Sequence, residues 1–512
     1  MCRVALMLVV LVATLGLLPT SSASAVPRDG AYIIVLRNDT SAGEFAHRHG
    51  LTPRHLFRRV FNGLAVSLTD AQARRLASDD GVVTLAPDRQ FHVDAVQATL
   101  PGGSPSLPPS IDRIDAEFAP IVATVGIAVL DTGIDLGRPE FNLQGAISFV
   151  AGAPTAQDDH GHGTHVAGIA AATVMPSGFR GVAPHAPLWA LKVLDGSGTG
   201  SDSSVIAAID WLTLNGPALG IRVANMSLKG EGSDTANCGV SGSTIVDPLH
   251  YAICQAVQAG IMFTAAAGNG SIDASGGVPA AYPEVITVSN IQDRDGRGGA
   301  QSPPNDDAFS PTSDFGPAVD IAAPGTAVLS TLPTGGCLLC SPTGYARLSG
   351  TSMSAPAVAG ALATYVALHP ATSTVGAPGT LAPAGTALIA QAKPQSDWCG
   401  FTGDPDALPE PMLYVGIPDG DCGAIATPDS DGDGLPDDVE TQIYGTDPNV
   451  GDTDADGCGD GKEVGPAHVL GGQRDPLYHW DFYDVTGDKS VDLTDTLLIL
   501  AHFGHGPSDD AL

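Results

Sequence analysis

The stretch Gly350-Thr-Ser-Met-Ser-Ala-Pro356 places a serine between a glycine turn and a run of small, apolar residues. Two other segments supply partners for that serine: Val129-Leu-Asp-Thr-Gly-Ile-Asp135 and His160-Gly-His-Gly-Thr-His-Val-Ala-Gly168. A serine hydroxyl becomes a good nucleophile when a neighbouring imidazole accepts its proton and a carboxylate orients that imidazole. The three segments therefore predict a nucleophilic site made of an aspartate, a histidine and a serine, in that chain order.

The surroundings of these residues indicate where in a fold they lie. Asp131 ends an apolar run from Val125 to Leu130, and active sites of open α/β sheets form at the carboxyl ends of strands. His162 opens a stretch of small residues suited to a tightly packed helix. Ser352 precedes an alanine-rich stretch that reaches His369, so we expect it at a helix N-terminus, where the dipole favours developing negative charge.

Strand-like and helix-like segments alternate through this part of the chain, which predicts an α/β fold with a mostly parallel sheet flanked by helices. The expected strands are Val125 to Leu130, Leu188 to Val193, Val223 to Ser227, Gly260 to Ala266, Val285 to Val288 and a last one at Met412 to Val415. The expected helices include Ser203 to Thr213 and Pro248 to Ala259.

The motifs D-T-G-I, H-G-T-H-V-A-G and G-T-S-M-S-A-P resemble those of subtilisin-like serine peptidases, the subtilases. The resemblance implies a secreted serine endopeptidase in which Asp131 orients, His162 is the general base and Ser352 is the nucleophile. Thr264-Ala-Ala-Ala-Gly-Asn269 resembles the family segment whose asparagine binds the oxyanion, which assigns that role to Asn269. No redox cofactor is implied.

Asn225-Met-Ser-Leu-Lys-Gly230 resembles the family strand S-L-G-G, which pairs with the substrate backbone and lines the specificity pocket. The substrate-binding residues implied in this way are Ser227, Leu228, Lys229, Ala266, Ala267 and Gly268. Lys229 replaces a glycine of the family pattern. We expect its side chain to project into solvent; the alternative is that it favours an acidic residue in the substrate.

Three other interpretations need separate consideration. His160, His162 and His165 have spacings that can hold zinc, but Gly163 stands where the H-E-x-x-H motif of metallopeptidases has its catalytic glutamate. A second possibility is a catalytically silent surface adhesion protein that works through its acidic C-terminal segment. A third is a processing peptidase for one dedicated partner protein, rather than a general degradative enzyme.

Residues 29 to 94 resemble the inhibitory prodomain of subtilisin-like peptidases. The segments that carry the resemblance are Ala31 to Leu36, Phe61 to Val66 and Val83 to Asp88. We expect strands at Tyr32 to Leu36, Leu64 to Leu68 and Val82 to Ala86, with a helix from Thr69 to Ala77. The resemblance implies an intramolecular inhibitor, removed by cleavage between His92 and Thr99.

Residues 1 to 25 have the features of a secretory signal: a basic start, an apolar run from Val4 to Leu18, and the cleavage pattern Ala23-Ser24-Ala25. No later apolar run is long enough to predict a membrane span. A linker from Pro101 to Ser110 follows the prodomain. We therefore expect a signal at 1–25, a prodomain at 29–94, a peptidase domain at 105–417 and an acidic module at 428–512.

Charge is concentrated in the acidic module. The whole chain has 23 basic and 56 acidic residues, a formal net charge of −33. Residues 428 to 512 contain 20 Asp and Glu against 3 Lys and Arg, and so carry −17. Such a segment argues against nucleic acid as a partner and favours bound cations, with calcium the obvious candidate outside a cell.

Three segments of the module repeat the spacing of calcium-binding loops, with oxygen ligands at positions one, three, five, nine and twelve. The expected ligands are Asp429, Asp431, Asp433, Asp437 and Glu440; Asp452, Asp454, Asp456, Asp460 and Glu463; and Asp484, Thr486, Asp488, Asp492 and Asp495. The first two sets resemble thrombospondin type 3 repeats. The third resembles one half of a dockerin; because a dockerin has two halves, a cohesin partner is doubtful.

Seven cysteines remain after removal of the signal, which contains Cys2. In an oxidising compartment the pairs Cys238 with Cys254, Cys337 with Cys340, and Cys399 with Cys422 are plausible, and Cys458 is left over. The sequence leaves this connectivity open.

Overall fold

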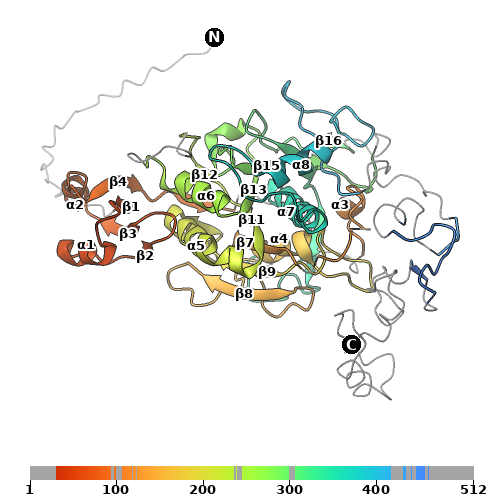
Figure 1. Ribbon diagram of the computed structural model, residues 1–512, viewed down its shortest axis with the longest axis horizontal. Coiled ribbons are helices and arrows are strands. Elements are labelled where there is room, and N and C mark those ends of the chain that lie inside the picture. The colour runs from red at the N-terminus through yellow and green to blue at the C-terminus, as the bar shows by residue number, and fades with distance from the viewer. Residues whose placement is uncertain are drawn as a thin grey trace, which may run out of the picture.

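The computed structural model describes residues 30–93, 97–99, 106–117, 119–122, 124–235, 238, 245–298, 306–416, 430–433, 440, 445–455 and 459–460. Figure 1 shows a large central body with a small N-terminal unit at one end and the described acidic segments at the other. The signal predicted at 1–25 lies outside the described residues.

The N-terminal unit folds around its own antiparallel sheet, in the strand order β2-β3-β1-β4. Its elements are β1 (Gly30–Leu36), α1 (Ala42–His49), β2 (His55–Phe57), β3 (Gly63–Leu68), α2 (Asp70–Leu76) and β4 (Val82–Pro87). Thr69 and Gln72 form a capping box that fixes the start of α2. The sheet and both helices share a buried apolar core that includes Ile34, Phe45 and Leu76. The unit therefore has an interior of its own.

The central sheet is mainly parallel. Its strands follow the order β16-β15-β13-β11-β7-β9-β8, and β17 also pairs with β15. The β15–β16 pair is antiparallel, whereas the other described pairs of this sheet are parallel. The strands are β7 (Gly126–Asp131), β8 (Leu143–Ser148), β9 (Leu188–Lys192), β11 (Ile221–Met226), β13 (Met262–Ala266), β15 (Val285–Gln292), β16 (Ala308–Phe309) and β17 (Ile321–Pro324).

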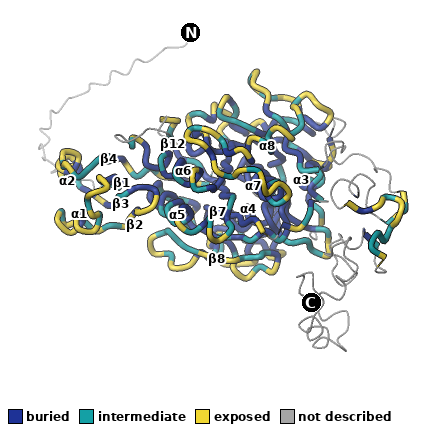
Figure 2. Tube along the Cα trace, viewed as in Figure 1, coloured by how far each residue is buried: buried dark blue, intermediate teal, exposed yellow. Residues whose placement is uncertain are grey.

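Helices cover both faces of this sheet (Figures 1 and 2). Alternate residues of a strand point to opposite faces. Accordingly, Ile127 and Val129 of β7 pack in one apolar core with α4 (His162–Ala171), α7 (Thr351–Leu368) and α8 (Pro383–Gln391). Ala128 and Leu130 pack in a second core with α5 (Asp202–Asn215) and α6 (Pro248–Gln258). Both faces are thus buried, as in other parallel sheets.

Helix α7 runs through the first of these cores. Among the described helices it is the one whose length and composition would suit a membrane span, and 89% of the apolar window is buried inside the molecule. A helix that is apolar around its whole circumference is expected at the centre of a large core. The burial of α7 in the core explains why the helix is apolar on all sides.

Short elements connect this framework and line its edges. They are α3 (Pro109–Asp112), η1 (Gly216–Leu219), η2 (Ala274–Gly276), β5 (Gln90–His92), β6 (Gln97–Thr99), β10 (Thr199–Ser201), β12 (Gly230–Glu231), β14 (Gly277–Val278), β18 (Val328–Thr331) and β19 (Tyr345–Ser349). β5 pairs with β10, β12 with β14, and β19 with both β18 and β6.

The expected elements are present with two differences. Each predicted strand between Val125 and Val288 corresponds to one of β7, β9, β11, β13 and β15. Met412 to Val415 does not form a strand: Met412 makes only isolated bridges to Ala322 and Lys393. The predicted linker ends earlier than expected, because α3 begins at Pro109.

Two of the expected disulfides are present. Cys238 and Cys254 are joined with a Cα–Cα distance of 5.5 Å, and Cys337 and Cys340 with one of 5.2 Å. Cys422 and Cys458 lie outside the described residues.

Candidate active site

The structure brings Asp131 and His162 together at the carboxyl end of the central sheet. Asp131 is the last residue of β7 and His162 the first of α4. His162 Nδ1 lies 2.8 Å from Asp131 Oδ1, and both side chains are fully buried. The Thr132 backbone N–H also donates to Asp131 Oδ1, at 2.7 Å. The carboxylate thus holds one ring nitrogen and leaves Nε2 on the opposite side of the imidazole.

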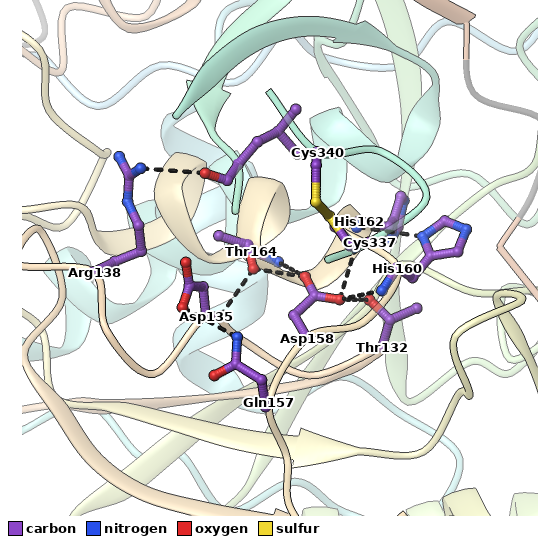
Figure 3. Close-up of a disulfide and its surroundings, with 12 residues drawn as sticks. Thr132, Asp135, Arg138, Gln157, Asp158, His160, His162, Thr164, Cys337 and Cys340 are labelled. Carbon is purple, nitrogen blue, oxygen red and sulfur yellow. Dashed lines mark hydrogen bonds between the residues drawn. A yellow bond between two sulfur atoms is a disulfide. The ribbon is translucent and has the colours of Figure 1, made fainter. Parts of the chain in front are cut away.

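A buried carboxylate that sequence reasoning missed, Asp158, fixes the start of α4 (Figure 3). Its Oδ1 accepts hydrogen bonds from the His160 and Gly161 N–H groups and from the Thr132 hydroxyl, at 3.0, 2.7 and 2.9 Å. Its Oδ2 accepts from the Thr164 N–H and hydroxyl, at 2.9 and 2.6 Å. A negative group at a helix N-terminus is stabilising. Asp158 is therefore a positioning residue, and its place just before His160-Gly-His-Gly is the signal that would have found it.

Ser352 lies in the first turn of α7, after Gly350, whose φ of 147° suits glycine. The backbone oxygen of Ser352 accepts a hydrogen bond from the Ser227 hydroxyl at 2.9 Å, which connects α7 to the end of β11. Within the described part of the chain, Ser352 Oγ and His162 Nε2 are both buried and have no hydrogen-bond partner. Catalytic hydrogen bonds are often long before a substrate binds. Oγ and Nε2 are therefore uncommitted to other groups.

Asn269 is attached to the same helix end. Its Oδ1 accepts hydrogen bonds from the Thr351 N–H and hydroxyl, at 2.9 and 3.2 Å. Gly268 also donates its N–H to the Thr351 hydroxyl, at 3.1 Å. Because Oδ1 faces Thr351, the amide nitrogen is on the other side of the group, close to Gly350. The turn after β13 and the N-terminus of α7 thus form one unit that carries Asn269 and Ser352.

The segment that follows the N-terminal unit lies between two strands of the central body. β5 pairs antiparallel with β10, and His92 exchanges backbone hydrogen bonds with Lys229, both at 3.1 Å. Val93 donates to the Gly198 oxygen at 2.8 Å. An extended peptide held by main-chain hydrogen bonds on both edges marks a peptide-binding cleft. Lys229, one of the residues expected to pair with a substrate backbone, pairs here with His92 of the segment that follows the prodomain.

The prediction that Lys229 projects into solvent is wrong. Its ammonium group forms an ion pair with Asp314, and the two side chains are 14% and 0% exposed. The lysine side chain passes close to Gly268 and Gly277, where a Cβ atom would collide with it. Asp314 Oδ1 in turn accepts from the Gly270 and Ile272 N–H groups, at 2.8 and 3.0 Å. The space beside the Gly268-Asn269 turn is consequently filled by a neutral ion pair.

The other residues expected to bind substrate are buried. Ala266 ends β13, and Ala267 follows it with its N–H bonded to the Val288 oxygen at 3.1 Å. Leu228 is 1% exposed and packs in the α5–α6 core. Ser227 is occupied with Ser352 and Asn225. Of this set, Lys229 and Gly268 are the ones whose surroundings place them beside the cleft.

The N-terminal unit is anchored on the N-terminal ends of α5 and α6. Arg89 reaches both Asp202, at 2.7 Å from Nε, and Asp247, at 2.8 Å from Nη2. Asp88 accepts from the Ser203 N–H and hydroxyl, at 2.8 and 2.7 Å. Burial raises the pKa of Asp202 to about 7 although Arg89 opposes the shift. Arg89 thus neutralises two carboxylates that the interface buries.

The histidines do not support a zinc site. His165 is fully buried, its Nε2 lies 3.2 Å from the Ala346 oxygen, and burial lowers its pKa to about 3. Among the described residues no metal-binding group includes His160, His162 or His165. A grouping of Cys238, Cys254 and Glu284 is excluded as a metal site, because its two thiols form a disulfide.

Part of the acidic module is described. Burial and the carboxylates of Asp431, Asp433 and Asp460 raise the pKa of Glu440 to about 7. Glu440 is fully buried, and its Oε2 has no hydrogen-bond partner among the described residues. The third, fifth and last positions of the first twelve-residue spacing therefore come close together, as calcium binding requires. Asp452 and Asp454 are also described, whereas Asp429, Asp437, Asp456, Glu463, Asp484, Thr486, Asp488, Asp492 and Asp495 lie outside the described residues.

Comparisons with known proteins match three stretches of the chain. The Subtilase family model matches residues 123–388, the peptidase inhibitor I9 model residues 31–94, and the bacterial TSP3 repeat model residues 429–451. Subtilisin DY of Bacillus licheniformis is 35% identical over 278 residues, which are 54% of this chain and 87% of the relative. Subtilisin Savinase of Lederbergia lenta is 38% identical over 277 residues, 53% and 88% of the two chains.

A solved structure supports the fold. Fervidolysin from Fervidobacterium pennivorans, described as a keratinolytic enzyme related to subtilisin, matches with a TM-score of 0.58 at 20% identity. The match covers 77% of this chain and 61% of that one. The α/β architecture expected from the sequence is thereby confirmed.

Proposed function

This chain belongs to the subtilase family, and from that premise we propose that Asp131, His162 and Ser352 carry out its peptidase reaction. The protein is a serine-type endopeptidase made as a zymogen, with an I9-type prodomain ahead of the enzyme. The observation that carries the assignment is the buried contact of 2.8 Å between His162 Nδ1 and Asp131 Oδ1. His162 begins α4, which packs against α7, the helix that holds Ser352.

The residues act in two stages. His162 Nε2 accepts the Ser352 proton while Oγ attacks the substrate carbonyl, and Asp131 stabilises the imidazolium that forms. The Asn269 amide and the Ser352 N–H donate to the oxyanion. His162 then gives its proton to the leaving amine, which leaves an acyl-enzyme. Water, deprotonated by His162, releases the acyl group and restores Ser352.

The assignment of Ser352 is tested by labelling with a serine-directed phosphonyl fluoride. We expect processed enzyme to take up one label and lose casein hydrolysis in parallel, because only an activated serine attacks the reagent. Peptide mapping should find the label on Ser352, with Ser354 two residues away as the internal control. His162→Ala should remain unlabelled. A label on another serine, or full casein hydrolysis after complete labelling of Ser352, would refute the assignment.

Neither alternative function is favoured. The silent adhesion protein predicts damage to the catalytic set, whereas Asp131, His162, Ser352 and Asn269 are all present. The described features fit a general peptidase as well as a peptidase dedicated to one partner, so they do not favour the dedicated role.

The proposal also covers export and calcium. Residues 1–25 have the charge, apolar run and cleavage pattern of a secretory signal. The two repeat-like loops bind calcium through Asp429 to Glu440 and Asp452 to Glu463, with the buried Glu440 oxygen as a fitting ligand. The ions would neutralise clustered carboxylates. The domain limits 29–94, 105–417 and 428–512 belong to the same proposal.

Lys229 and Asp314 restrict the cleft to substrates with small side chains next to the scissile bond. The pair fills the space beside Gly268, and it is neutral as a whole. It therefore disfavours bulk without attracting acidic residues. We expect the enzyme to prefer glycine, alanine or serine as the substrate residue next to the scissile bond.

Removing the pair should change this preference. In the double variant Lys229→Gly with Asp314→Asn, which avoids a buried unpaired carboxylate, we expect kcat/KM for substrates with leucine or phenylalanine at this position to rise about 10–100-fold relative to alanine. The double variant Lys229→Met with Asp314→Asn, which keeps the volume but removes both charges, should retain the small-residue preference. Measurement with a peptide series that varies only this position decides the matter, and an unchanged ratio in the double variant with Lys229→Gly would contradict the assignment.

A further inference from the structure

Three carboxylates outside the active site converge between β15 and β16. Asp293 directly follows β15, Asp295 is two residues further on, and Asp306 lies two residues before β16. One oxygen from each carboxylate lies within 4.8 Å of the other two. In Figure 1 β16 lies on the side of the central body away from the N-terminal unit.

The backbone of the same loop holds each carboxylate in place. Asp293 Oδ1 accepts the Gly296 N–H at 3.0 Å, and Asp295 Oδ1 accepts the Arg297 N–H at 3.0 Å. Asp306 Oδ1 accepts the Arg294 N–H at 2.8 Å. Each side chain is therefore oriented through one oxygen, which leaves its other oxygen for a ligand. Such supporting hydrogen bonds are typical of metal-binding carboxylates.

Burial makes this arrangement costly without a counterion. Asp293 and Asp306 are only 5% and 6% exposed. Asp293 Oδ2 is buried and has no hydrogen-bond partner among the described residues. Isolated buried carboxylates are strongly unfavourable unless they are paired or bound to a metal. The buried, unpaired oxygen therefore favours a positively charged ligand at this place.

Arg113, whose charge acts on Asp293, donates its hydrogen bonds within the described residues to other groups and none to the cluster. Arg113 is fully buried, and its Nε donates to Asp307 Oδ1 at 2.8 Å. Its Nη2 donates to the Cys399 and Gly400 oxygens, at 2.8 and 2.9 Å. Within the described part of the chain no lysine, arginine or histidine forms an ion pair with Asp293, Asp295 or Asp306.

We propose that Asp293, Asp295 and Asp306 bind a calcium ion, separate from those of the acidic module. A Ca–O bond is about 2.4 Å long, so ligands on opposite sides of one ion are about 4.8 Å apart, and the three oxygens fit within one coordination shell. An all-carboxylate set suits a hard cation and not zinc. Backbone oxygens or water would complete the six to eight ligands that calcium prefers.

The ion would tie the end of β15 to the start of β16 and hold this loop against α3. Gly296 already lies so close to Asp112 and Pro109 of α3 that a Cβ atom would crowd them. Asp307, next to Asp306, reaches the C-terminal part of the domain through Arg113. The site therefore stabilises the junction of three chain segments, and the proposal does not depend on the peptidase chemistry.

The number of calcium ions bound per chain, measured by equilibrium dialysis, tests the site directly. Full precursor with Ser352→Ala, which prevents self-digestion, is stripped with chelator and dialysed against radioactive calcium. We expect Asp293→Asn with Asp306→Asn in this background to bind one ion fewer per chain, and calcium to raise its melting temperature less than that of the parent. The control is Asp112→Asn, which removes a charge beside the same loop but no ligand; its count should equal that of the parent.

The outcomes separate the proposal from its alternatives. An unchanged count in the double variant overturns it, as does an equal loss in Asp112→Asn, which would indicate a general effect of charge. If the double variant does not fold, Asp295→Asn decides, because Asp295 is exposed and its loss should leave folding intact. We expect one ion to bind about tenfold more weakly in that variant. An isotherm identical to that of the parent overturns the site.

Discussion

We expect the Ser352→Ala precursor to keep its prodomain and to hydrolyse casein about 10⁶-fold more slowly than wild type, the loss found when the corresponding serine of subtilisin is removed. Without Oγ there is no acyl-enzyme, and His162 has no proton to accept. Wild-type chain of residues 26–512 should lose the segment that ends between His92 and Thr99. Intact masses and casein hydrolysis, recorded with calcium and with chelator, measure both effects.

Ser354→Ala is the matched control for this experiment. Ser354 lies in the same turn of α7, and its hydroxyl donates to the Ala323 oxygen at 3.0 Å. Its loss should cost about 1 kcal/mol of stability and leave processing intact. If the wild-type precursor remains whole and inactive, as the Ser352→Ala precursor does, an external activating peptidase is required. If Ser352→Ala is still processed and active, Ser352 is not the nucleophile.

We expect Arg89→Ala in the prodomain to weaken its inhibition of the processed enzyme by about 10²–10³-fold. The complex buries the Asp202 and Asp247 carboxylates to 2% and 5% exposure, and Arg89 contacts both. Its removal would leave two carboxylates without this partner in the interface, which costs far more than the loss of a surface ion pair. The strands of the prodomain do not depend on Arg89, because its core lies elsewhere.

Inhibition constants of prodomain variants, added to processed enzyme, measure this effect. Arg74→Ala is the control: Arg74 is an exposed arginine on α2, and its replacement should alter the constant by no more than about twofold. Circular dichroism of each variant shows whether it is folded. A change of less than about tenfold for folded Arg89→Ala would mean that Asp88 and the β5 pairing carry the affinity without it.

The parts of the fold that sequence could predict are those set by local pattern. The buried runs that became β7, β9, β11, β13 and β15 are continuous and apolar, and the three catalytic motifs sit directly at element ends. The strand predicted at Met412 to Val415 is absent, because a short apolar run is equally compatible with a strand and with a buried segment that makes isolated bridges.

Contacts between distant segments could not be predicted in this way. The direction of Lys229 is decided by Asp314, which is 85 residues away in the chain. Asp158 was overlooked because its hydrogen bonds depend on how the β7 and α4 ends meet. The Asp293 and Asp306 carboxylates converge only when β15 and β16 pair antiparallel.

The strands on either side of the expected processing region bear on how the protein matures. Before this region, β5 is bonded to β10 and to Lys229. After it, β6 pairs with β19, which leads directly to Gly350 and Ser352. The bond to be cut is thus tethered at both ends within its own molecule, so the first cut is a unimolecular event with a high effective concentration. Dilution does not slow that event.

Dilution does promote dissociation of the cleaved prodomain, because its rebinding to the enzyme is bimolecular. Concentration therefore leaves the cutting of the precursor unaffected but governs the appearance of activity, which is delayed in a crowded compartment and hastened once the protein disperses.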